Sequence, residues 1–219
     1  MPSFRDTKRY DLLTASPLIV FNVFAAAGLA ERISESARAL RNIPDAMNAL
    51  ALLAAFAFLA VEVGCLVIRK VPKSFSENWL SRAVALAGAN AGLALLLLPR
   101  ASISPAVQAI SSFLLFTGAT ASAYVTIWLG RGFSVFPQAR QLTMGGPYRL
   151  VRHPLYLSET LMTLGLMLQY RQPWALVMAI VVTTLQLPRV LYEERILRFT
   201  YPDYKAYALR TARFLPGIY

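Results

Sequence analysis

The stretch "AMNALALLAAFAFLAVEVGCLVI", residues 46–68, decides the class of fold. It is apolar apart from Asn48 and Glu62, and it is longer than the about 20 residues with which an α-helix crosses the hydrocarbon core of a bilayer. The whole chain has the same character, since 57% of its 219 residues are hydrophobic, 15% are charged and its mean hydropathy is +0.50. A soluble domain usually keeps about a quarter of its residues charged. The sequence therefore predicts an all-α integral membrane protein.

Similar apolar blocks predict about six hydrophobic helices in all. They cover residues 12–30, 46–68, 83–98, 104–130, 154–170 and 173–187. The last two are short and only Arg171 and Gln172 separate them, so they suit a tight helical hairpin, tilted or partly re-entrant, as an alternative to two full spans. The first block also resembles a cleaved signal peptide, but multispan proteins often begin with a similar signal anchor, and we interpret it as a span.

A change in composition near Gly130 divides the chain into two regions. Four predicted transmembrane helices occupy residues 1–130, whereas residues 131–219 are rich in Arg, Tyr, Pro and Glu. Pro188 is predicted to end or kink the last apolar block, because a proline inside a helix removes a backbone hydrogen bond. A separate C-terminal helix should follow it. We expect the functional side chains in the second region, which is predicted to contain a loop, the hairpin and this helix.

Basic residues are distributed unequally between the two faces of the predicted membrane domain. With six crossings, 17 of the 22 Lys and Arg residues fall on the face that carries both termini, and five fall on the other. Short loops rich in Lys and Arg stay in the cytoplasm, so both termini and the C-terminal helix are predicted to be cytoplasmic. The formal net charge of +11 then indicates contact with the headgroups of membrane lipids rather than with nucleic acid.

The chain has a single cysteine, Cys65, which lies inside an apolar block. One cysteine cannot form an intramolecular disulfide or a cysteine-based metal site. We therefore interpret Cys65 as a packing residue, and no metal is predicted as a partner.

A first polar cluster spans residues 140–159, "RQLTMGGPYRLVRHPLYLSE". Residues 145–147 predict a turn whose bare backbone can approach a ligand. Pro154 favours the first turn of a helix, where its missing N–H is not needed, so His153, the only histidine of the chain, should lie at the start of a helix. Tyr156 lies one turn further along. Taken singly, these side chains also suit an exposed loop with interfacial anchors.

Two acidic residues lie inside predicted spans. They are Glu62 and Glu159. An acid inside a span costs about 2.5 to 3.5 kcal/mol and normally faces a partner or a cavity. Glu159 shares a predicted helix face with Tyr156, so we assign it to the first polar cluster. No neighbouring motif interprets Glu62.

A second polar cluster follows the last block: "PRVLYEERILRFTYPDYKAYALRTARFLPGIY", residues 188–219. Arg189 and Glu193 are four residues apart and therefore share one helix face, while Glu194 points elsewhere. The alternative is a solvated juxtamembrane helix in which Arg189 and Glu193 form an ion pair that stabilises the helix by only a few tenths of a kcal/mol. A closed hairpin, however, would bring this helix beside His153 at one membrane face, and the two clusters would then form a pocket.

The two clusters together resemble the isoprenylcysteine carboxyl methyltransferase family, and more loosely the related phospholipid-amine methyltransferases. The resemblance rests on "GPYRLVRHPLY" followed by "RVLYEERIL" and "YPDYKAY", which occur in the family's order and spacing. It covers about residues 138–216. It implies that the protein binds S-adenosylmethionine as its cofactor.

The resemblance also assigns roles to particular residues. Those that it places at the cofactor are Arg140, Gln141, Leu142, Thr143, Tyr148, His153, Pro154, Leu155, Tyr156, Glu193 and Glu194. It implies that Arg189 faces the methyl acceptor and that Glu193 binds the cofactor, so both are candidate catalytic residues. A carboxylate can bind the ammonium group of the cofactor through a charge-assisted hydrogen bond.

Two positions depart from the family pattern. Ser158 occupies a position that is often glycine, and Tyr201-Pro202 replaces a frequent Phe-Gly pair. We expect these changes to reshape the rim of the pocket without removing a cofactor-binding side chain.

The resulting expectation is a membrane methyltransferase that uses S-adenosylmethionine and acts on a lipidic or small hydrophobic acceptor, for example the carboxylate of a prenylated cysteine. A carboxylate acceptor held by Arg189 needs no general base, whereas an amine or a thiol must lose a proton to Glu159 or Glu193. The residues on the acceptor side are therefore Arg189 and Glu159. The alternatives are an NADPH-dependent membrane sterol-type reductase, which carries a similar His-Pro-x-Tyr run, and a non-catalytic lipid-binding membrane protein.

Overall fold

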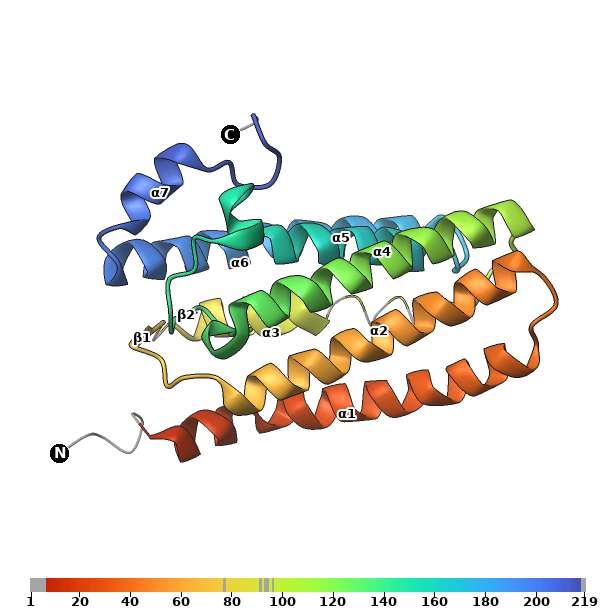
Figure 1. Cartoon of the computed structure of the whole chain (residues 1–219), viewed down its shortest axis with the longest axis horizontal. Helices are drawn as coiled ribbons and strands as arrows, with labels where there is room; N and C mark the ends of the chain where they lie inside the picture. Colours follow the sequence, from red (N-terminus) through yellow and green to blue (C-terminus); the bar gives the residue numbers. More distant parts are fainter. Residues whose placement is uncertain (1–6, 77, 91, 93–94, 96, 218–219) are drawn as a thin grey trace.

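The computed structural model describes residues 7–76, 78–90, 92, 95 and 97–217. It is predominantly helical and confirms the predicted all-α membrane class. The helices are α1 (Lys8–Arg38), α2 (Ile43–Ile68), α3 (Trp79–Asn90), α4 (Pro105–Leu129), α5 (Pro154–Met167), α6 (Trp174–Thr200) and α7 (Tyr204–Arg210), with the shorter elements β1 (Ser74–Phe75), η3 (Gly130–Gly132), β2 (Gln138–Ala139) and η4 (Gly146–Arg149) between them (Figure 1).

The helices differ in whether they can cross a bilayer. Within the described parts of the chain, four are long and apolar enough to do so, namely α1, α2, α4 with its 3₁₀ extension, and α6. By contrast, α3 has 12 residues and α5 has 14, and both are shorter than a full span. The short α5 agrees with the prediction for the block at 154–170. The block at 83–98 forms α3 up to Asn90, and residues 91, 93, 94 and 96 lie outside the described residues.

The prediction that a new helix begins after Pro188 is wrong. Pro188 lies inside α6, which runs without a break from Trp174 to Thr200. The proline forfeits one backbone hydrogen bond, but the helix that continues beyond it buries Arg189, Val190 and Glu194 against the rest of the protein. These contacts offset the local cost. As a result, the last apolar block and the first part of the second polar cluster, residues 188–200, form one continuous helix.

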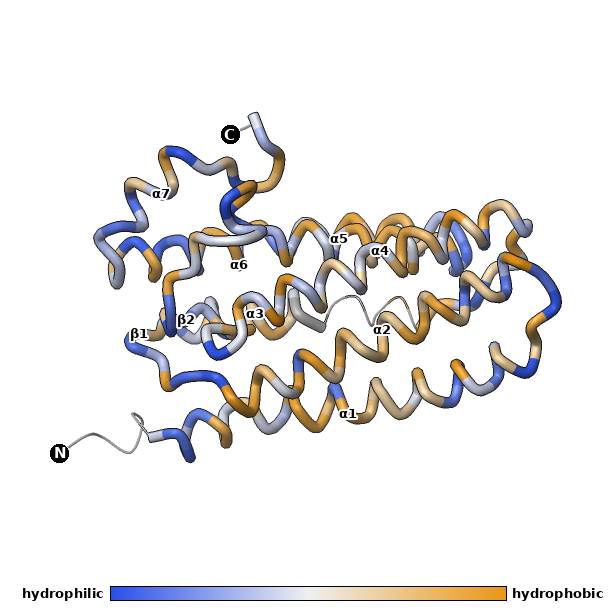
Figure 2. The backbone as a smooth tube through the Cα atoms, viewed as in Figure 1, coloured by the Kyte–Doolittle hydropathy of each residue, from blue (hydrophilic) through white to orange (hydrophobic). Residues whose placement is uncertain are grey.

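The helices α1, α2, α4 and α5 lie side by side in this order, and α3 packs against α6 (Figure 1). Figure 2 shows hydrophobic residues along the middle of the helices and hydrophilic residues toward both ends. Large apolar side chains such as Phe24 and Ile127 are exposed on the outside of the bundle. Lipid chains are as apolar as these side chains, so this surface suits the interior of a bilayer.

The contact between α4 and α5 is especially close because small residues line it. A Cβ atom built on Gly118 would lie 2.5 Å from the backbone nitrogen of Met162. Ser122 donates a hydrogen bond to the hydroxyl of Ser158 at 2.9 Å. Small residues with polar side chains are typical of tightly packed membrane helices. Ser158, which departs from the family pattern, thus serves the packing of α5 on α4 rather than the rim of the pocket.

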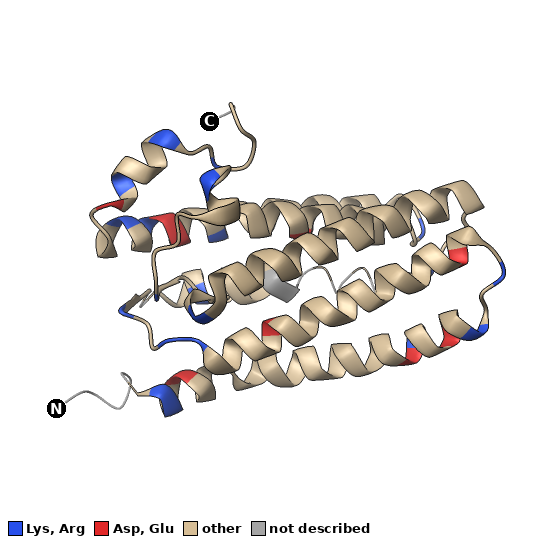
Figure 3. Ribbon diagram, in the orientation of Figure 1, with Lys and Arg blue, Asp and Glu red and all other residues tan. Residues whose placement is uncertain are grey.

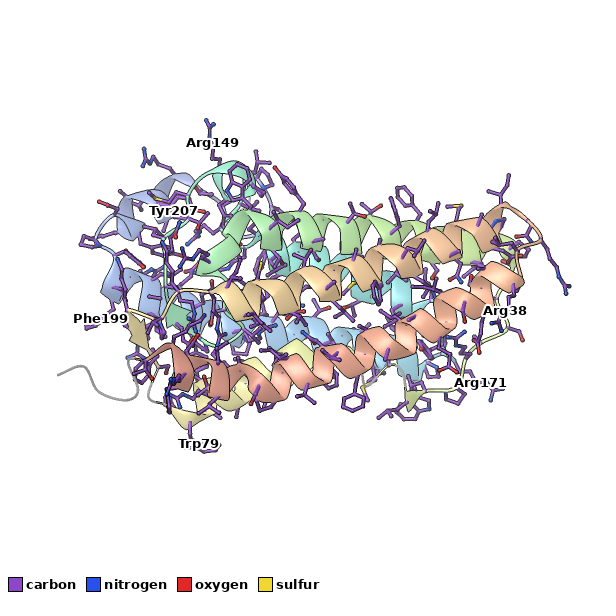
Figure 4. The ribbon with its side chains drawn as sticks, turned by 60° about the horizontal axis from the view of Figure 1, so that its bottom comes forward. Arg38, Trp79, Arg149, Arg171, Phe199 and Tyr207 are labelled. Atoms are coloured by element: carbon purple, nitrogen blue, oxygen red, sulfur yellow. The ribbon has the colours of Figure 1, made fainter. Side chains whose placement is uncertain are left out.

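The two ends of the bundle are named as follows. At the site end, α1 and α5 begin and α2, α4 and α6 terminate. The opposite end is the far end. The start of α1 and the C-terminal segment both lie at the site end (Figure 1). Lys and Arg are concentrated toward the two ends of the bundle (Figure 3). Arg149 and Phe199 mark the site end in Figure 4, and Arg38 and Arg171 mark the far end. Which of these ends faces the cytoplasm stays a prediction.

Candidate active site

A cavity of about 600 Å³ lies between the helices. Residues from α1 to α6 and from the segment between β2 and α5 form its walls. Polar side chains line it at the site end, and its middle is lined by apolar residues such as Leu52, Phe58 and Leu115. Small-molecule sites have volumes of roughly 300 to 1,000 Å³. The cavity can therefore hold a polar ligand at the site end together with a hydrocarbon chain.

The predicted turn at 145–147 forms one wall of the site end. Gly146 has a φ of +56°, and a Cβ atom at this position would lie 2.2 Å from the ring of Trp128. Only glycine therefore lets the backbone pack against this indole. The turn places Tyr148 in the cavity, where burial raises the pKa of its phenol well above the ordinary value. Tyr148 consequently remains a neutral hydrogen-bond donor.

His153 lies at the start of α5, as predicted, and Pro154 is the first residue of that helix. The backbone N–H groups of Arg152 and His153 donate to the carbonyls of Ala212 at 2.8 Å and Arg213 at 3.1 Å. These bonds attach the C-terminal tail beside the start of α5. The imidazole of His153 lines the cavity, and its Nε2 lies 3.2 Å from Oε1 of Glu194.

Just outside the cavity, behind His153, the carboxylate of Glu194 contacts four basic side chains. Its carboxylate lies 2.9 Å from Arg152, 3.2 Å from His153, 2.9 Å from Arg198 and 3.1 Å from Arg213. The side chain of Glu194 is only 2% exposed and it does not line the cavity among the described residues. This geometry favours a positioning role for Glu194, which holds His153 and the C-terminal tail in place.

Arg189, Tyr156 and the two remaining acids of the motifs meet inside the cavity. The guanidinium carbon of Arg189 lies 4.8 Å from the ring centroid of Tyr156, and the Tyr156 hydroxyl donates to Oε2 of Glu193 at 3.0 Å. Nη1 of Arg189 lies 3.8 Å from Oε2 of Glu159. The two sequence clusters are thus brought together as the hairpin predicted. A Cβ on Gly88 would lie 2.5 Å from Cδ of Arg189, so α3 confines the arginine.

Some polar residues of the cavity belong to neither motif, and two of these lie near Arg189 or Glu159 or beside a residue that does. Glu62 on α2 and Asn22 on α1 line the same cavity and lie beside each other. Glu62 is close enough to Glu159 and Arg189 to interact with them electrostatically. The position of Glu62 inside a span was the only signal for it in the sequence.

Arg140 is directed away from the cavity. Its guanidinium contacts the carboxylate of Asp11 at 2.6 Å, and Arg69 contacts the same carboxylate at 2.9 Å. Arg140 also donates to the carbonyl of Lys70 and to the side chain of Gln138. This buried cluster attaches β2 and the following segment to α1 and α2.

The predicted cofactor residues fall into two groups, those that line the cavity and those that do not. Those that line the cavity are Gln141, Leu142, Thr143, Tyr148, His153, Leu155, Tyr156 and Glu193. Among the described residues Arg140, Pro154 and Glu194 do not line it, and neither do Ser158 and Tyr201, at which the chain departs from the family pattern.

The site end of the cavity has groups that suit a charged, methionine-derived cofactor. Oγ1 of Thr143 and both Nε and Nη1 of Arg189 are buried without a hydrogen-bond partner within the described part of the chain. Buried polar atoms are normally paired, so these atoms indicate a polar ligand. The Glu193 carboxylate can accept hydrogen bonds from an ammonium group. The Thr143 hydroxyl and the Glu193 carboxylate therefore suit the polar groups of S-adenosylmethionine.

Comparison with known families gives a match over the second half of the cavity-forming chain. The model of the phospholipid methyltransferase family matches residues 99–204. This region runs from the segment before α4 to the start of α7 and contains both His153 and Glu193. The helices α1 to α3, which contribute Asn22 and Glu62 to the cavity, lie outside it. No curated protein matches the chain.

Proposed function

We propose that the protein is a membrane methyltransferase that transfers a methyl group from S-adenosylmethionine to a lipidic acceptor. The match of residues 99–204 to the phospholipid methyltransferase family, which is related to the isoprenylcysteine carboxyl methyltransferases, supports this proposal. The observation that carries this proposal is the arrangement of Arg189, Tyr156 and Glu193 in one cavity. The NADPH-dependent reductase and the non-catalytic lipid-binding protein gain no support from the family match.

The cofactor is proposed to occupy the site end of the cavity. S-adenosylmethionine would supply an electrophilic methyl group on a positively charged sulfur. Glu193 binds the ammonium group, and Thr143 and Tyr148 provide hydroxyl groups for its polar atoms. The Tyr156 hydroxyl donates to Glu193 and therefore fixes the orientation of the carboxylate. His153 forms the adjoining wall and is itself held by Glu194.

The acceptor is proposed to lie with its polar group at Arg189 and its hydrocarbon part along the apolar middle of the cavity. An arginine can bind a carboxylate with two parallel hydrogen bonds, which orients the nucleophile for in-line attack. Nε and Nη1 of Arg189 donate to no described residue, so this guanidinium has donors available to a ligand. This arrangement suits the carboxylate of a prenylated cysteine, for which no general base is needed.

One observation favours an acceptor with a removable proton as a second candidate. Three carboxylates, those of Glu62, Glu159 and Glu193, line the cavity and interact with the guanidinium of Arg189. A second carboxylate brought by the acceptor would add to this negative charge, whereas an amine or a thiol would not. Glu159 lies beside Arg189 and is the group placed to accept the proton.

The proposal is tested by methyl transfer in lipid nanodiscs. The purified protein is incubated with S-adenosylmethionine that carries a tritiated methyl group and with three acceptors that share one hydrocarbon chain but end in a carboxylate, an amine or a thiol. We expect labelling of one acceptor class, and the labelled class decides between the two candidates. Absence of transfer to all three, together with oxidation of NADPH by the protein, would reject methyl transfer in favour of the reductase.

A further inference from the structure

The cavity does not end at its apolar middle. It continues toward the far end of the bundle, where Arg32 and Arg100 line it together with Tyr170. Tyr156 and Tyr170 are separated by 14 residues that include most of α5. At a rise of 1.5 Å per residue this separation is about 20 Å, so the far end is remote from Arg189 and Glu193.

Three segments are fixed together at the far end of the cavity. The N–H of Arg171 donates to the carbonyl of Pro99, and the N–H of Ala101 donates to the carbonyl of Gln169, both at 3.0 Å. These bonds form an antiparallel bridge that places Arg100 opposite Tyr170. Tyr170 is 3% exposed and packs against Leu95 and Ala175. The connections after α5 and before α4 therefore form a fixed floor rather than loose loops.

The third segment is α1, which brings Arg32 to this floor. Arg32 lies beside Tyr170 and close enough to Arg100 for the two charges to repel each other. Glu35 on α1 interacts electrostatically with Arg32, but among the described residues neither Arg32 nor Arg100 has a carboxylate within the ion-pair distance of 4.0 Å. Two neighbouring guanidinium groups without an acidic partner are stabilised by a bound anion.

The walls between the two polar ends of the cavity are apolar, which indicates that the ligand has an apolar part. They include Leu29, Leu52, Phe58, Leu115 and Leu166, which come from four different helices. A free anion would leave this apolar volume unused, whereas an amphiphile would fill it. We propose that Arg32, Arg100 and Tyr170 form a second binding site, which takes the phosphate headgroup of an anionic lipid whose chain lies in the middle of the cavity.

This site goes beyond methyl transfer, because none of its groups is near Arg189. The lipid would enter from the leaflet at the far end, and its chain would form part of the wall that the acceptor meets. Other arginines of the far end, such as Arg38 and Arg171, do not line the cavity among the described residues, so they can contact headgroups of the surrounding bilayer only from outside. They provide matched controls.

The test uses hexadecyl phosphate as the probe, with the protein in a neutral detergent and binding measured by native mass spectrometry. We expect one molecule to bind to the parent protein. Binding to the double variant Arg32→Gln/Arg100→Gln should be at least about tenfold weaker, whereas the control Arg38→Gln/Arg171→Gln should bind with the affinity of the parent. Equal losses in the two double variants, or no loss in the first, would overturn the proposal. If the first double variant does not fold, Arg100→Gln alone provides the same comparison with Arg171→Gln.

Comparison with further ligands shows whether the site binds an anionic lipid, a free anion or a purely apolar molecule. Hexadecanol and inorganic phosphate should each bind at least about tenfold more weakly than hexadecyl phosphate. Ala55→Phe, which narrows the middle of the cavity, should weaken binding of hexadecyl phosphate but not of inorganic phosphate. Inorganic phosphate that binds as tightly as hexadecyl phosphate would show that the chain is not held. S-adenosylmethionine binding should not change in Arg32→Gln/Arg100→Gln, so a parent protein that fails to bind S-adenosylmethionine would reject the proposed cofactor without affecting this test.

Discussion

The hydroxyl of Tyr156 donates a hydrogen bond to Oε2 of Glu193 at 3.0 Å, and this bond connects the start of α5 to the last turns of α6. It joins the two polar clusters through two residues that are 37 positions apart in the sequence. Because the ring of Tyr156 also lies against the guanidinium of Arg189, one side chain contacts both the proposed cofactor residue and the proposed acceptor residue. The geometry of the two ligands is thus coupled through Tyr156.

Glu193→Gln should weaken binding of S-adenosylmethionine. The amide keeps the size of the side chain and can still accept from Tyr156, but it loses the charge that binds the ammonium group. Loss of a hydrogen bond to a charged group costs about 1.5 to 3 kcal/mol, which corresponds to an increase of Kd of about 10- to 150-fold. Isothermal titration of the variant measures this. Glu35→Gln at the far end is the control, and an unchanged Kd in Glu193→Gln would remove Glu193 from the cofactor site.

Arg189→Lys should slow methyl transfer by at least about tenfold, which is a loss of about 1.4 kcal/mol of transition-state stabilisation. Lysine keeps the positive charge beside Tyr156 but loses the planar pair of donors that orients the acceptor. The Kd of S-adenosylmethionine should stay within about twofold of the parent value. Turnover near the parent rate would place Arg189 outside the active site, and a large rise in the cofactor Kd would assign it to the other ligand.

Glu194→Gln should destabilise the protein, because it leaves Arg152 and the tail residue Arg213 without their carboxylate. Removing one partner of a buried ion pair typically costs about 3 to 5 kcal/mol. Arg198→Gln removes a partner whose side chain is 51% exposed and should cost less than about 1 kcal/mol. Thermal unfolding in detergent compares the two variants. Equal changes of Tm in both would contradict the positioning role of Glu194.

The orientation in the membrane is tested by labelling single cysteines in intact cells after Cys65→Ser. The exposed positions Arg149 and Lys205 lie at the site end, and the exposed positions Arg41 and Arg171 lie at the far end. A maleimide that does not cross membranes should label cysteines at 41 and 171 from outside but not those at 149 and 205, because basic loops stay in the cytoplasm. The reverse pattern would invert the proposed topology.

Much of the fold could be predicted because lipid imposes simple requirements on a sequence. A block such as 46–68 must form a helix to satisfy its backbone in a bilayer, and Pro154 marks the start of α5 because its ring suits a first helical turn. The prediction for Pro188 failed for a related reason. The cost of a proline inside α6 is local, but the contacts of Arg189 and Glu194 that offset it are tertiary and leave no periodic signal.

The candidate site could be predicted only where motifs describe it. His153, Tyr156 and Glu193 belong to sequence runs with fixed spacing, and they line one cavity as expected. Asp11 and Arg140 are 129 residues apart, and nothing in the sequence pairs them, although their contact positions the segment that follows β2. Contacts of this kind depend on how α1 packs along α2, which the pattern of apolar residues does not specify.

The most direct test of the central claim is to locate bound S-adenosylmethionine in the protein. The purified protein is irradiated with S-adenosylmethionine that carries a tritiated methyl group, digested and analysed by mass spectrometry, with and without an excess of S-adenosylhomocysteine. The proposed site predicts label in the peptides that contain Tyr148 and Tyr156, and loss of this label in the presence of the competitor. Label that the competitor does not remove, or label confined to the far end around Arg32 and Tyr170, would contradict the account.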